Sequence, residues 1–216
     1  MGWHFGGHEE AEEHIKEREQ KRSNWVSRLY LPVGATANVT IVDNDLEVDA
    51  RTGKKPPILY YEHQYYLNGR WGNFFTCSGR GCKMCKNGNR ASFVGAYSII
   101  HHDRWEDKQG NVHENEMILL VVKSFGIKEL ARQSKKRNGL LGAQFEVART
   151  GDKQPNSGGV FEFEGKVETV KYLQETIPID NITPVDYMKV LAPKSDEEIM
   201  KILGAEKAEN QDDILF

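Results

Sequence analysis

The amino-acid sequence predicts a mainly β fold with some helix (β+α), arranged as a small β-barrel. Two observations predict it: several short runs alternate apolar and polar residues, and helix-capping signals occur from residue 183 onward. Hydrophobic side chains make up 38% of the 216 residues and aromatic ones 10%, which is enough to bury a core. A barrel is expected because closure removes exposed strand edges.

The first element is an N-terminal arm over residues 1–23, expected to be partly helical. Within it, residues 8–22 place glutamates early and Lys and Arg late, the order that the helix dipole favours. The β core is expected over residues 24–182. Its expected strands cover residues 28–31, 37–42, 58–66, 71–76, 93–100, 117–123 and 144–149, followed by a hairpin over 160–172, with one helix over 126–136.

Two short helices are expected over residues 183–204. Thr183-Pro184 and Ser195-Asp196 are helix-start signals, and Gly204 is the expected stop for the second helix. Residues 205–216 are then expected to form a disordered acidic tail that binds partners.

Three cysteines, Cys77, Cys82 and Cys85, lie within nine residues. An odd number so close together is a poor disulfide framework and predicts a metal site in a reducing compartment. Cys82 and Cys85 form a Cys-x2-Cys knuckle, whose spacing lets two thiolates converge on one tetrahedral ion. Three thiolates plus one imidazole make a closed site that favours zinc, so we expect one structural Zn²⁺ in a loop over residues 63–90.

The fourth ligand must come from outside the cysteine cluster. His63 is the favoured candidate, because it precedes Cys77 by 14 positions on a strand that can flank the loop. His101 and His102 remain open as alternatives. A redox pair at the knuckle, or an iron–sulfur cluster, is the competing interpretation of the cysteines.

The formal net charge of −3 conceals an uneven distribution. Residues 194–216 hold seven acids and three bases, whereas residues 64–92 hold five bases and no acid. Aromatic residues are interleaved with those bases, which suits single-stranded nucleic acid: bases stack on rings while Lys and Arg follow the phosphates. Strand alternation turns about half of these rings into the core, so the choice within each Tyr-Tyr pair stays open. The candidate strand-binding residues are Tyr61, Tyr66, Arg70, Trp71, Phe75, Arg80, Lys83, Lys86, Arg90, Lys135, Lys136 and Arg137.

Two stretches resemble known families. Glu62-His63, the run from Cys82 to Gly88 and the segment 146–151 resemble the zinc-containing, OB-fold single-stranded-DNA-binding proteins of tailed phages. This resemblance implies an OB-like barrel with a zinc-loop insertion. By the same resemblance, the zinc ligands are His63, Cys77, Cys82 and Cys85.

The end of the sequence, residues 212–216, resembles the acidic tail of bacterial single-stranded-DNA-binding proteins, although Leu215 stands where that tail usually has Pro. The resemblance implies that the tail recruits replication, recombination and repair proteins. The implied contact residues are Asp212, Asp213, Ile214, Leu215 and Phe216.

The function expected from these features is sequence-independent coating of single-stranded DNA during phage DNA replication, recombination and repair, in the host cytoplasm. The alternative is a zinc-ribbon transcription or RNA-binding factor, since Cys-x2-Cys knuckles occur there too. An enzyme is not expected, because the sequence has no Walker-type phosphate loop, no H-E-x-x-H and no G-x-S-x-G. No run of 18 apolar residues is present, so we expect neither a membrane span nor a membrane partner.

Overall fold

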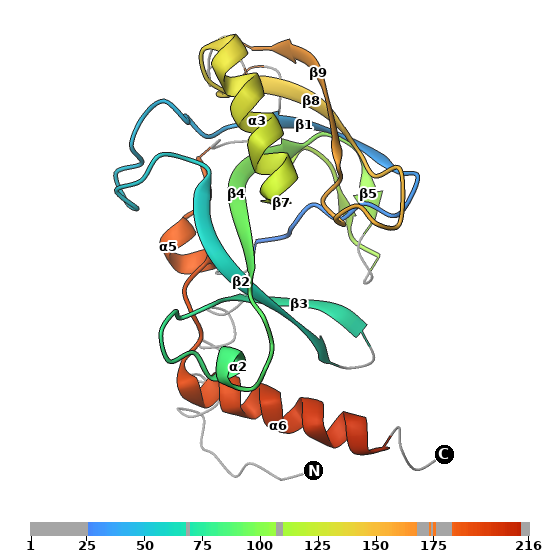
Figure 1. Cartoon of the computed structure of the whole chain (residues 1–216). Helices are drawn as coiled ribbons and strands as arrows, with labels where there is room; N and C mark the ends of the chain where they lie inside the picture. Colours follow the sequence, from blue (N-terminus) through green and yellow to red (C-terminus); the bar gives the residue numbers. More distant parts are fainter. Residues whose placement is uncertain are drawn as a thin grey trace, which may run out of the picture.

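The computed structural model describes residues 26–67, 70–106, 110–167, 173, 175 and 183–212. For residues 66–67, 70–73 and 205–212 it describes the backbone alone. The expected arm over residues 1–23 lies outside the described residues. The described chain forms an antiparallel sheet, with helix α3 at one end of the molecule and helix α6 at the other (Figure 1).

Five strands follow one another through antiparallel pairs in the order β7-β4-β1-β8-β9. Their bounds are β1 Thr36–Ile41, β4 Ser92–His101, β7 Glu116–Lys123, β8 Ala143–Ala148 and β9 Val160–Lys166. Alternate residues enter the core, as in β8, where buried and half-buried positions alternate along the strand. Among the described residues no pairing joins β7 to β9, so the closed barrel that the sequence suggests is not found.

Helix α3, Ser124–Arg137, connects β7 to β8 and packs Leu130 and Ile127 onto the main core. It ends at Asn138, whose φ of 53° lies in the left-handed region. The Lys166 ammonium group donates to the carbonyl oxygens of Arg137, Asn138 and Gly139 at 3.0, 3.3 and 3.0 Å. This lysine satisfies carbonyl groups that the end of the helix leaves without intrahelical partners.

A β-hairpin is inserted in the chain between β1 and β4. It consists of β2, Ile58–Leu67, and β3, Arg70–Thr76, and β2 also pairs with the first half of β4. The expected strands at 58–66 and 71–76 are thereby confirmed, and their turn at 68–69 lies outside the described residues. A short ribbon of β5, Trp105–Glu106, and β6, Val112–His113, lies between β4 and β7 in the chain.

One expected strand is wrong. Residues 28–31 make only an isolated parallel bridge, between Arg28 and Leu119, because the Leu31 N–H donates to the carbonyl of Asn156 on another segment and does not continue along β7. Of the hairpin expected over 160–172, residues 160–166 form the strand β9, and residues 168–172 lie outside the described part.

The C-terminal part forms α5, Tyr187–Val190, and α6, Asp196–Asp212. Ser195 and Glu198 cap α6 reciprocally, with the Glu198 N–H donating to Ser195 Oγ at 3.2 Å. The expectation that Gly204 ends this helix is wrong. Residues 205–209 are Ala, Glu, Lys, Ala and Glu, strong helix formers that outweigh the cost of one glycine, so residues 205–212 are helical.

A buried hydrogen-bond network fixes α5 to the sheet. The Asp43 carboxylate, 2% exposed, accepts from the Ser98 N–H at 2.6 Å and from the Tyr187 hydroxyl at 2.5 Å. Ser98 Oγ accepts in turn from the Val185 N–H at 2.9 Å. Burial raises the pKa of Asp43 to about 6, although these hydrogen bonds act in the opposite direction.

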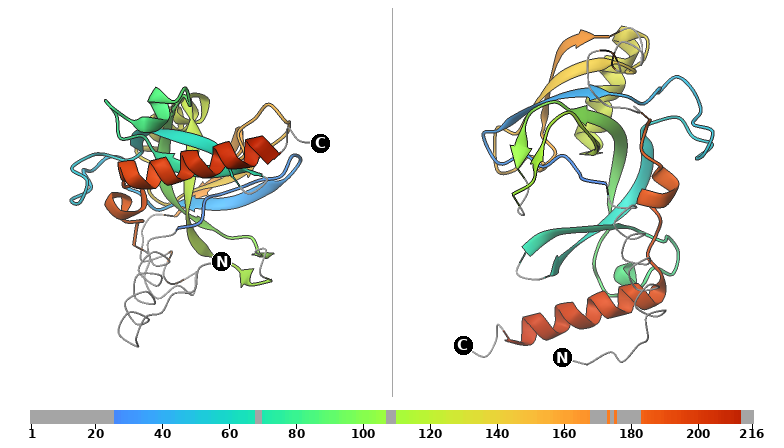
Figure 2. Two further views of the ribbon diagram at one scale, coloured as in Figure 1. Left: turned by 90° about the horizontal axis from the view of Figure 1, so that it is seen from below. Right: turned by 180° about the vertical axis from the view of Figure 1, so that it is seen from behind.

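A separate small core lies below the sheet, where α6 covers the β2–β3 hairpin (Figure 2). The buried members from the hairpin and the cysteine loop are Tyr65, Phe75, Cys82 and Met84, and those from α6 are Ile199 and Leu203. This core holds the cysteine loop, residues 77–90, between the hairpin and α6.

Candidate metal centre

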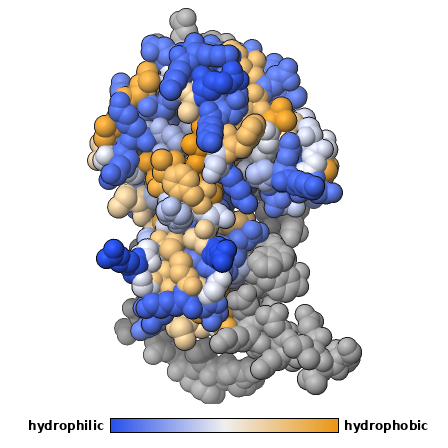
Figure 3. Space-filling view, in the orientation of Figure 1, coloured by the Kyte–Doolittle hydropathy of each residue, from blue (hydrophilic) through white to orange (hydrophobic). Residues whose placement is uncertain are grey.

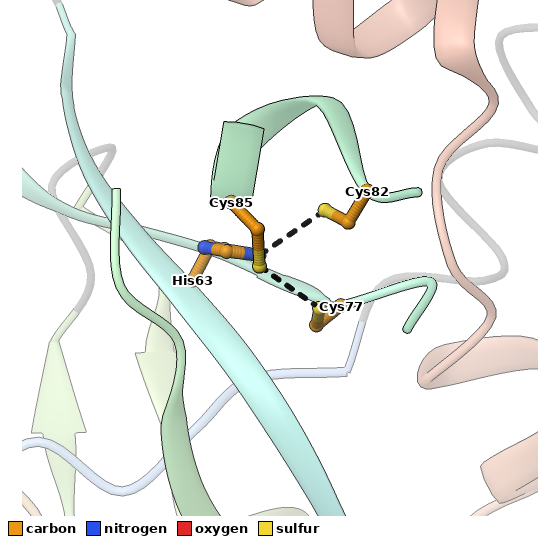
Figure 4. Close-up of side chains that lie close together, drawn as sticks. All are labelled: His63, Cys77, Cys82 and Cys85. Atoms are coloured by element: carbon orange, nitrogen blue, oxygen red, sulfur yellow. Dashed lines mark hydrogen bonds between the residues drawn. The ribbon is translucent and has the colours of Figure 1, made fainter. Parts of the chain in front are cut away.

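Four side chains from different elements converge beside this small core (Figure 4). His63 comes from the middle of β2, and Cys77 follows β3. Cys82 directly precedes α2, the single helical turn Lys83–Lys86, and Cys85 lies within it. The ligand atoms of all four lie within 4.8 Å of one another. Three candidate thiolates and one imidazole therefore face a common point.

The distances within this group fit a tetrahedral metal ion. Cys77 Sγ lies 3.7 Å from Cys85 Sγ, and His63 Nε2 lies 3.3 Å from Cys82 Sγ and 3.6 Å from Cys85 Sγ. Zinc–sulfur bonds of about 2.3 Å and a zinc–nitrogen bond of about 2.0 Å give tetrahedral edges of about 3.8 Å and about 3.5 Å. The donor atoms are thus spaced as the edges of such a site.

The local sequence explains how the loop reaches this shape. Gly79 and Gly81 have φ values of 83° and 94°, which a side chain would strain, and they turn the chain from Cys77 to the knuckle. The Lys86 N–H then donates to the Cys82 carbonyl at 3.1 Å, which forms the turn of α2. Two of the sulfurs are therefore positioned by contacts close in sequence.

The thiols differ in their electrostatic surroundings. Burial raises the pKa of Cys82, but the backbone N–H groups of Cys85 and Met84 outweigh it and lower that pKa to about 6. Burial, together with the neighbouring Cys77 thiol, raises the pKa of Cys85 to about 11. A cation among the sulfurs would offset the repulsion between them, because a bound metal deprotonates a coordinating thiol.

A hydrogen bond fixes the orientation of the histidine. His63 is fully buried, and its Nδ1 lies 3.0 Å from Asn89 Oδ1. The Asn89 amide nitrogen donates to the Gln64 carbonyl at 2.9 Å, so Asn89 Oδ1 is the atom that faces the imidazole and accepts from it. The proton therefore resides on Nδ1, and the lone pair of Nε2 points at the cysteines, as in metal-bound histidines.

The other two candidate histidines lie elsewhere. His101 Nε2 is 3.5 Å from Asp103 Oδ2, and His102 places its ring nitrogens 2.6 Å from Thr40 Oγ1 and 3.0 Å from Asn115 Oδ1. The structure brings His63 to the cysteines, and neither His101 nor His102. The four residues His63, Cys77, Cys82 and Cys85 can hold a metal ion, and all four positions of a tetrahedral ion would be taken by protein atoms.

The aromatic candidates for strand binding divide between surface and core. Tyr61 is 57% exposed, whereas Phe75 is 4% exposed and packs against Tyr65 and His63. The expectation that Phe75 presents its ring to a ligand is corrected: it faces the same side as His63, its register partner in β2, and the cysteine loop covers that side. The side chains of Tyr66, Arg70 and Trp71 lie outside the described part of the structure.

The basic candidates form two separate groups. Arg80, Lys86 and Arg90 are exposed around the cysteine loop, and Lys83 is half-exposed. Lys135 and Lys136 are exposed in the last turn of α3, whereas Arg137 is half-buried with its guanidinium carbon 3.5 Å from the centre of the Phe163 ring. The end of α3 and the cysteine loop lie at opposite ends of the molecule in Figure 1 and in the right-hand view of Figure 2. The structure therefore does not unite the two groups.

The sequence analysis missed two residues that adjoin the site. Asn89 had no distinguishing signal, because its contact with His63 forms only when the loop folds back on β2. Phe93 is 40% exposed, pairs with Tyr61 across β2 and β4, and lies with its ring centre 5.3 Å from that of Tyr61. The sequence does not single out Phe93, because it lies at the start of the apolar run of β4. Strand alternation nevertheless places its side chain on the face opposite to that of the buried Val94.

Comparisons of this chain with protein-family models, with curated proteins and with solved structures found no match. In the described part of the chain, no helix is both long and apolar enough to cross a membrane. Of the expected partner-binding residues, Asp212 is the last residue of α6, and 213–216 lie outside the described residues.

Proposed function

We propose that the protein binds single-stranded DNA without sequence selectivity and that a structural zinc ion holds its cysteine loop in place. The observation that carries this proposal is an exposed pair of aromatic rings beside the basic cysteine loop: Tyr61 and Phe93 lie in contact, with their ring planes tilted at 56°. Stacking on exposed rings is tolerant of base identity, because every base has a π-face, and basic side chains alongside can follow the phosphates.

The surroundings of the two rings support a strand-binding face. Leu59, two residues before Tyr61 on the same side of β2, is 52% exposed, so an apolar patch continues along the strand. Apolar residues reach the surface over β2 and β4, between more hydrophilic regions above and below (Figure 3). Arg90 is exposed three residues before Phe93, and Arg80 and Lys86 are exposed on the loop beyond it.

The strand order supports an OB-like architecture. The path β7-β4-β1-β8-β9 contains five strands. In chain order these five are β1, β4, β7, β8 and β9, and α3 lies between the third and the fourth of them. OB folds are partly open five-stranded barrels that bind oligonucleotides on strands 2 and 3 and on the loops between strands 1 and 2 and strands 4 and 5. The β2–β3 hairpin and the cysteine loop are an insertion between the first and second of these strands, where such a ligand would lie.

Zinc suits the donor set. Soft thiolates with one imidazole favour zinc over harder cations, and a site closed by four protein ligands is of the structural type. In this proposal the metal does no chemistry on the ligand. It fixes the loop that carries Arg80, Lys86 and Arg90.

The wider role rests on the resemblance of the sequence. The protein would coat single-stranded DNA during phage replication, recombination and repair in the host cytoplasm, and residues 212–216 would recruit enzymes of those processes. Two acids followed by Ile, Leu and Phe suit a partner with an apolar pocket and a basic rim.

The test is a fluorescence titration of the purified chain with oligo-dT and with a duplex of equal length, at two salt concentrations. A metal assay is run on the same sample. We expect one zinc per chain, much tighter binding of oligo-dT than of duplex, and log K falling with log salt at about −0.7 per phosphate contacted. Tight, sequence-dependent binding of a duplex or of an RNA hairpin would refute the proposal and favour a zinc-ribbon transcription or RNA-binding factor.

A further inference from the structure

A pocket opens between the cysteine loop and the C-terminal helix. It has a volume of about 270 Å³ and lies between α2 and α6, lined by Lys83, Lys86, Asn87, Met200, Leu203 and Gly204. On the α6 side it is apolar, because Met200, Leu203 and Gly204 lie on one face of the helix at spacings of three and four residues. Met200 is 56% exposed although it adjoins the buried core of α6.

Gly204 makes room for an occupant. A Cβ atom built on Gly204 would have no heavy atom within 4 Å, so the space above this glycine is open. A larger side chain at this position would extend into that space without meeting the protein. The pocket is therefore a site that a substitution can fill while the fold around it is kept.

The rim on the α2 side is basic. Lys86 is exposed, and Lys83 faces Asp196 across a long distance of 3.9 Å, with the two side chains 40% and 64% exposed. An ion pair so long and so exposed contributes little, which leaves Lys83 able to pair with another acid. The pocket thus combines an apolar floor with a cationic edge.

One segment of this chain has the matching chemistry. Asp212 and Asp213 are followed by Ile214, Leu215 and Phe216, so two acids stand beside three apolar side chains. The acids suit Lys83 and Lys86, and the apolar side chains suit the floor of Met200 and Leu203. Charge complementarity of this kind orients a segment as it docks.

The geometry of α6 excludes docking of this segment within one copy. The helix continues eight residues beyond Gly204 to Asp212, which at about 1.5 Å per residue carries the chain about 12 Å away from the pocket. The four residues 213–216 reach at most about 14 Å when fully extended, and a reversal of direction uses about two of them. The remaining reach of about 7 Å falls short of the pocket.

We propose that the pocket between α2 and α6 binds residues 212–216 of a second copy of this chain, so that copies join head to tail. The contact is heterologous, because the pocket of one copy meets the end of α6 of the next. Each assembly then keeps one free pocket at one end and one free segment at the other, so it grows with concentration. The inference does not require nucleic-acid binding, although Lys86 on the rim also belongs to the proposed strand-binding face.

Sedimentation velocity of the full chain over a range of micromolar concentrations tests the proposal. We expect the wild type to grow beyond a dimer as concentration rises, and Gly204→Leu, which fills the pocket, to remain monomeric. The triple variant Ile214→Ala, Leu215→Ala, Phe216→Ala should also remain monomeric. Gly204→Ala is the matched control: it adds one methyl group to the helix and should still associate.

Mixing the two blocked variants gives the sharpest outcome. Gly204→Leu keeps its C-terminal segment and the triple variant keeps its pocket, so an equimolar mixture should form a dimer that cannot extend. A wild type that is monomeric at every concentration, or variants that associate like the wild type, would overturn the proposal.

A labelled peptide of residues 207–216 locates the contact. It should bind the triple variant, and Gly204→Leu introduced into that variant should weaken binding at least about tenfold, since one large apolar side chain loses its burial. Displacement by oligo-dT together with full binding to the filled pocket would place the segment on a nucleic-acid face and refute the inference.

Discussion

Asn89 offers the sharpest test of how the metal centre is built. Its side chain accepts from His63 Nδ1 at 3.0 Å and donates to the Gln64 carbonyl at 2.9 Å, and it is not itself one of the four candidate ligands. Asn89→Ala removes both hydrogen bonds and leaves all four candidate ligands in place. The imidazole then loses the group that fixes its tautomer and orientation.

The magnitude follows from these two contacts. A hydrogen bond contributes about 0.5–1.5 kcal/mol net, so the loss of two corresponds to about 1–3 kcal/mol. That range agrees with the 10- to 100-fold loss of metal affinity, about 1.4–2.8 kcal/mol, that the removal of such supporting groups causes. We expect Asn89→Ala to bind zinc about 10- to 100-fold more weakly than the wild type.

Competition with a chromophoric chelator at fixed pH measures this affinity. Asn87→Ala is the matched control, because Asn87 lies in the same loop and is exposed, and its backbone N–H, not its side chain, bonds the end of α2. Asn89→Asp keeps an acceptor for His63 and should retain most of the affinity. If Asn89→Ala binds zinc within twofold of the wild type, the assigned role of Asn89 in orienting His63 is wrong.

Three further predictions concern the aromatic patch, the small core and the buried carboxyl group. Tyr61→Ala and Phe93→Ala should each weaken oligo-dT binding by about 1–3 kcal/mol in a fluorescence titration. Tyr30→Ala should not, although Tyr30, on another segment, is 64% exposed and so more exposed than either ring. Equal effects of all three would count against a stacking face. Phe75→Ala should lower the free energy of unfolding, measured in urea, by about 3–5 kcal/mol, because it leaves a cavity in the small core. A variant that is as stable as the wild type but binds oligo-dT weakly would show that Phe75 contacts the ligand. The raised pKa of Asp43, about 6 against 3.8, means that the folded state favours the protonated carboxyl group. This contribution to stability is therefore fully present below pH 4 and is lost as the pH rises through 6, a loss of about 3 kcal/mol at about 1.36 kcal/mol per pKa unit. Asp43→Asn keeps an acceptor oxygen and should abolish this pH dependence, so parallel pH profiles of the free energy of unfolding for wild type and variant would contradict the prediction.

The metal centre illustrates how far the sequence alone reaches. The knuckle of Cys82 and Cys85 is set by the turn of α2 between them, so their spacing in the sequence already predicted convergence. Cys77 joins them through a loop of four residues, again a local matter. The local sequence does not identify the histidine ligand, because His63, His101 and His102 all lie on or beside expected strands. Only the packing of the loop against β2 brings His63 to the cysteines.

The aromatic residues show the opposite limit. Alternation predicts that neighbouring residues of a strand face opposite sides, but it does not say which side is covered. Tyr61 and His63 share one face of β2, yet Tyr61 is 57% exposed and His63 is buried, because the cysteine loop and α6 cover the strand only from His63 onward. Phe75 entered the small core for the same reason.

In helix α6 some features follow from the local sequence and others only from the tertiary structure. Its start at Ser195 and Glu198 follows from a local capping pattern. Its continuation past Gly204 follows from the strong helix propensity of the residues after this glycine. The position of α6 in the fold does not follow from the local sequence, because Ile199 and Leu203 contact residues more than 100 positions earlier in the chain.

The sequence by itself determined most of the strands, the helix α3, the three sulfur donors and the uneven charge, because each depends on neighbours within a few positions along the chain. The tertiary structure decided which histidine joins the sulfurs, which rings remain at the surface, that β7 and β9 do not pair among the described residues, and that α6 borders a pocket beside α2. Those features depend on contacts between segments far apart in the sequence, and such contacts are fixed only when the whole chain minimises its exposed apolar surface and unpaired polar groups together.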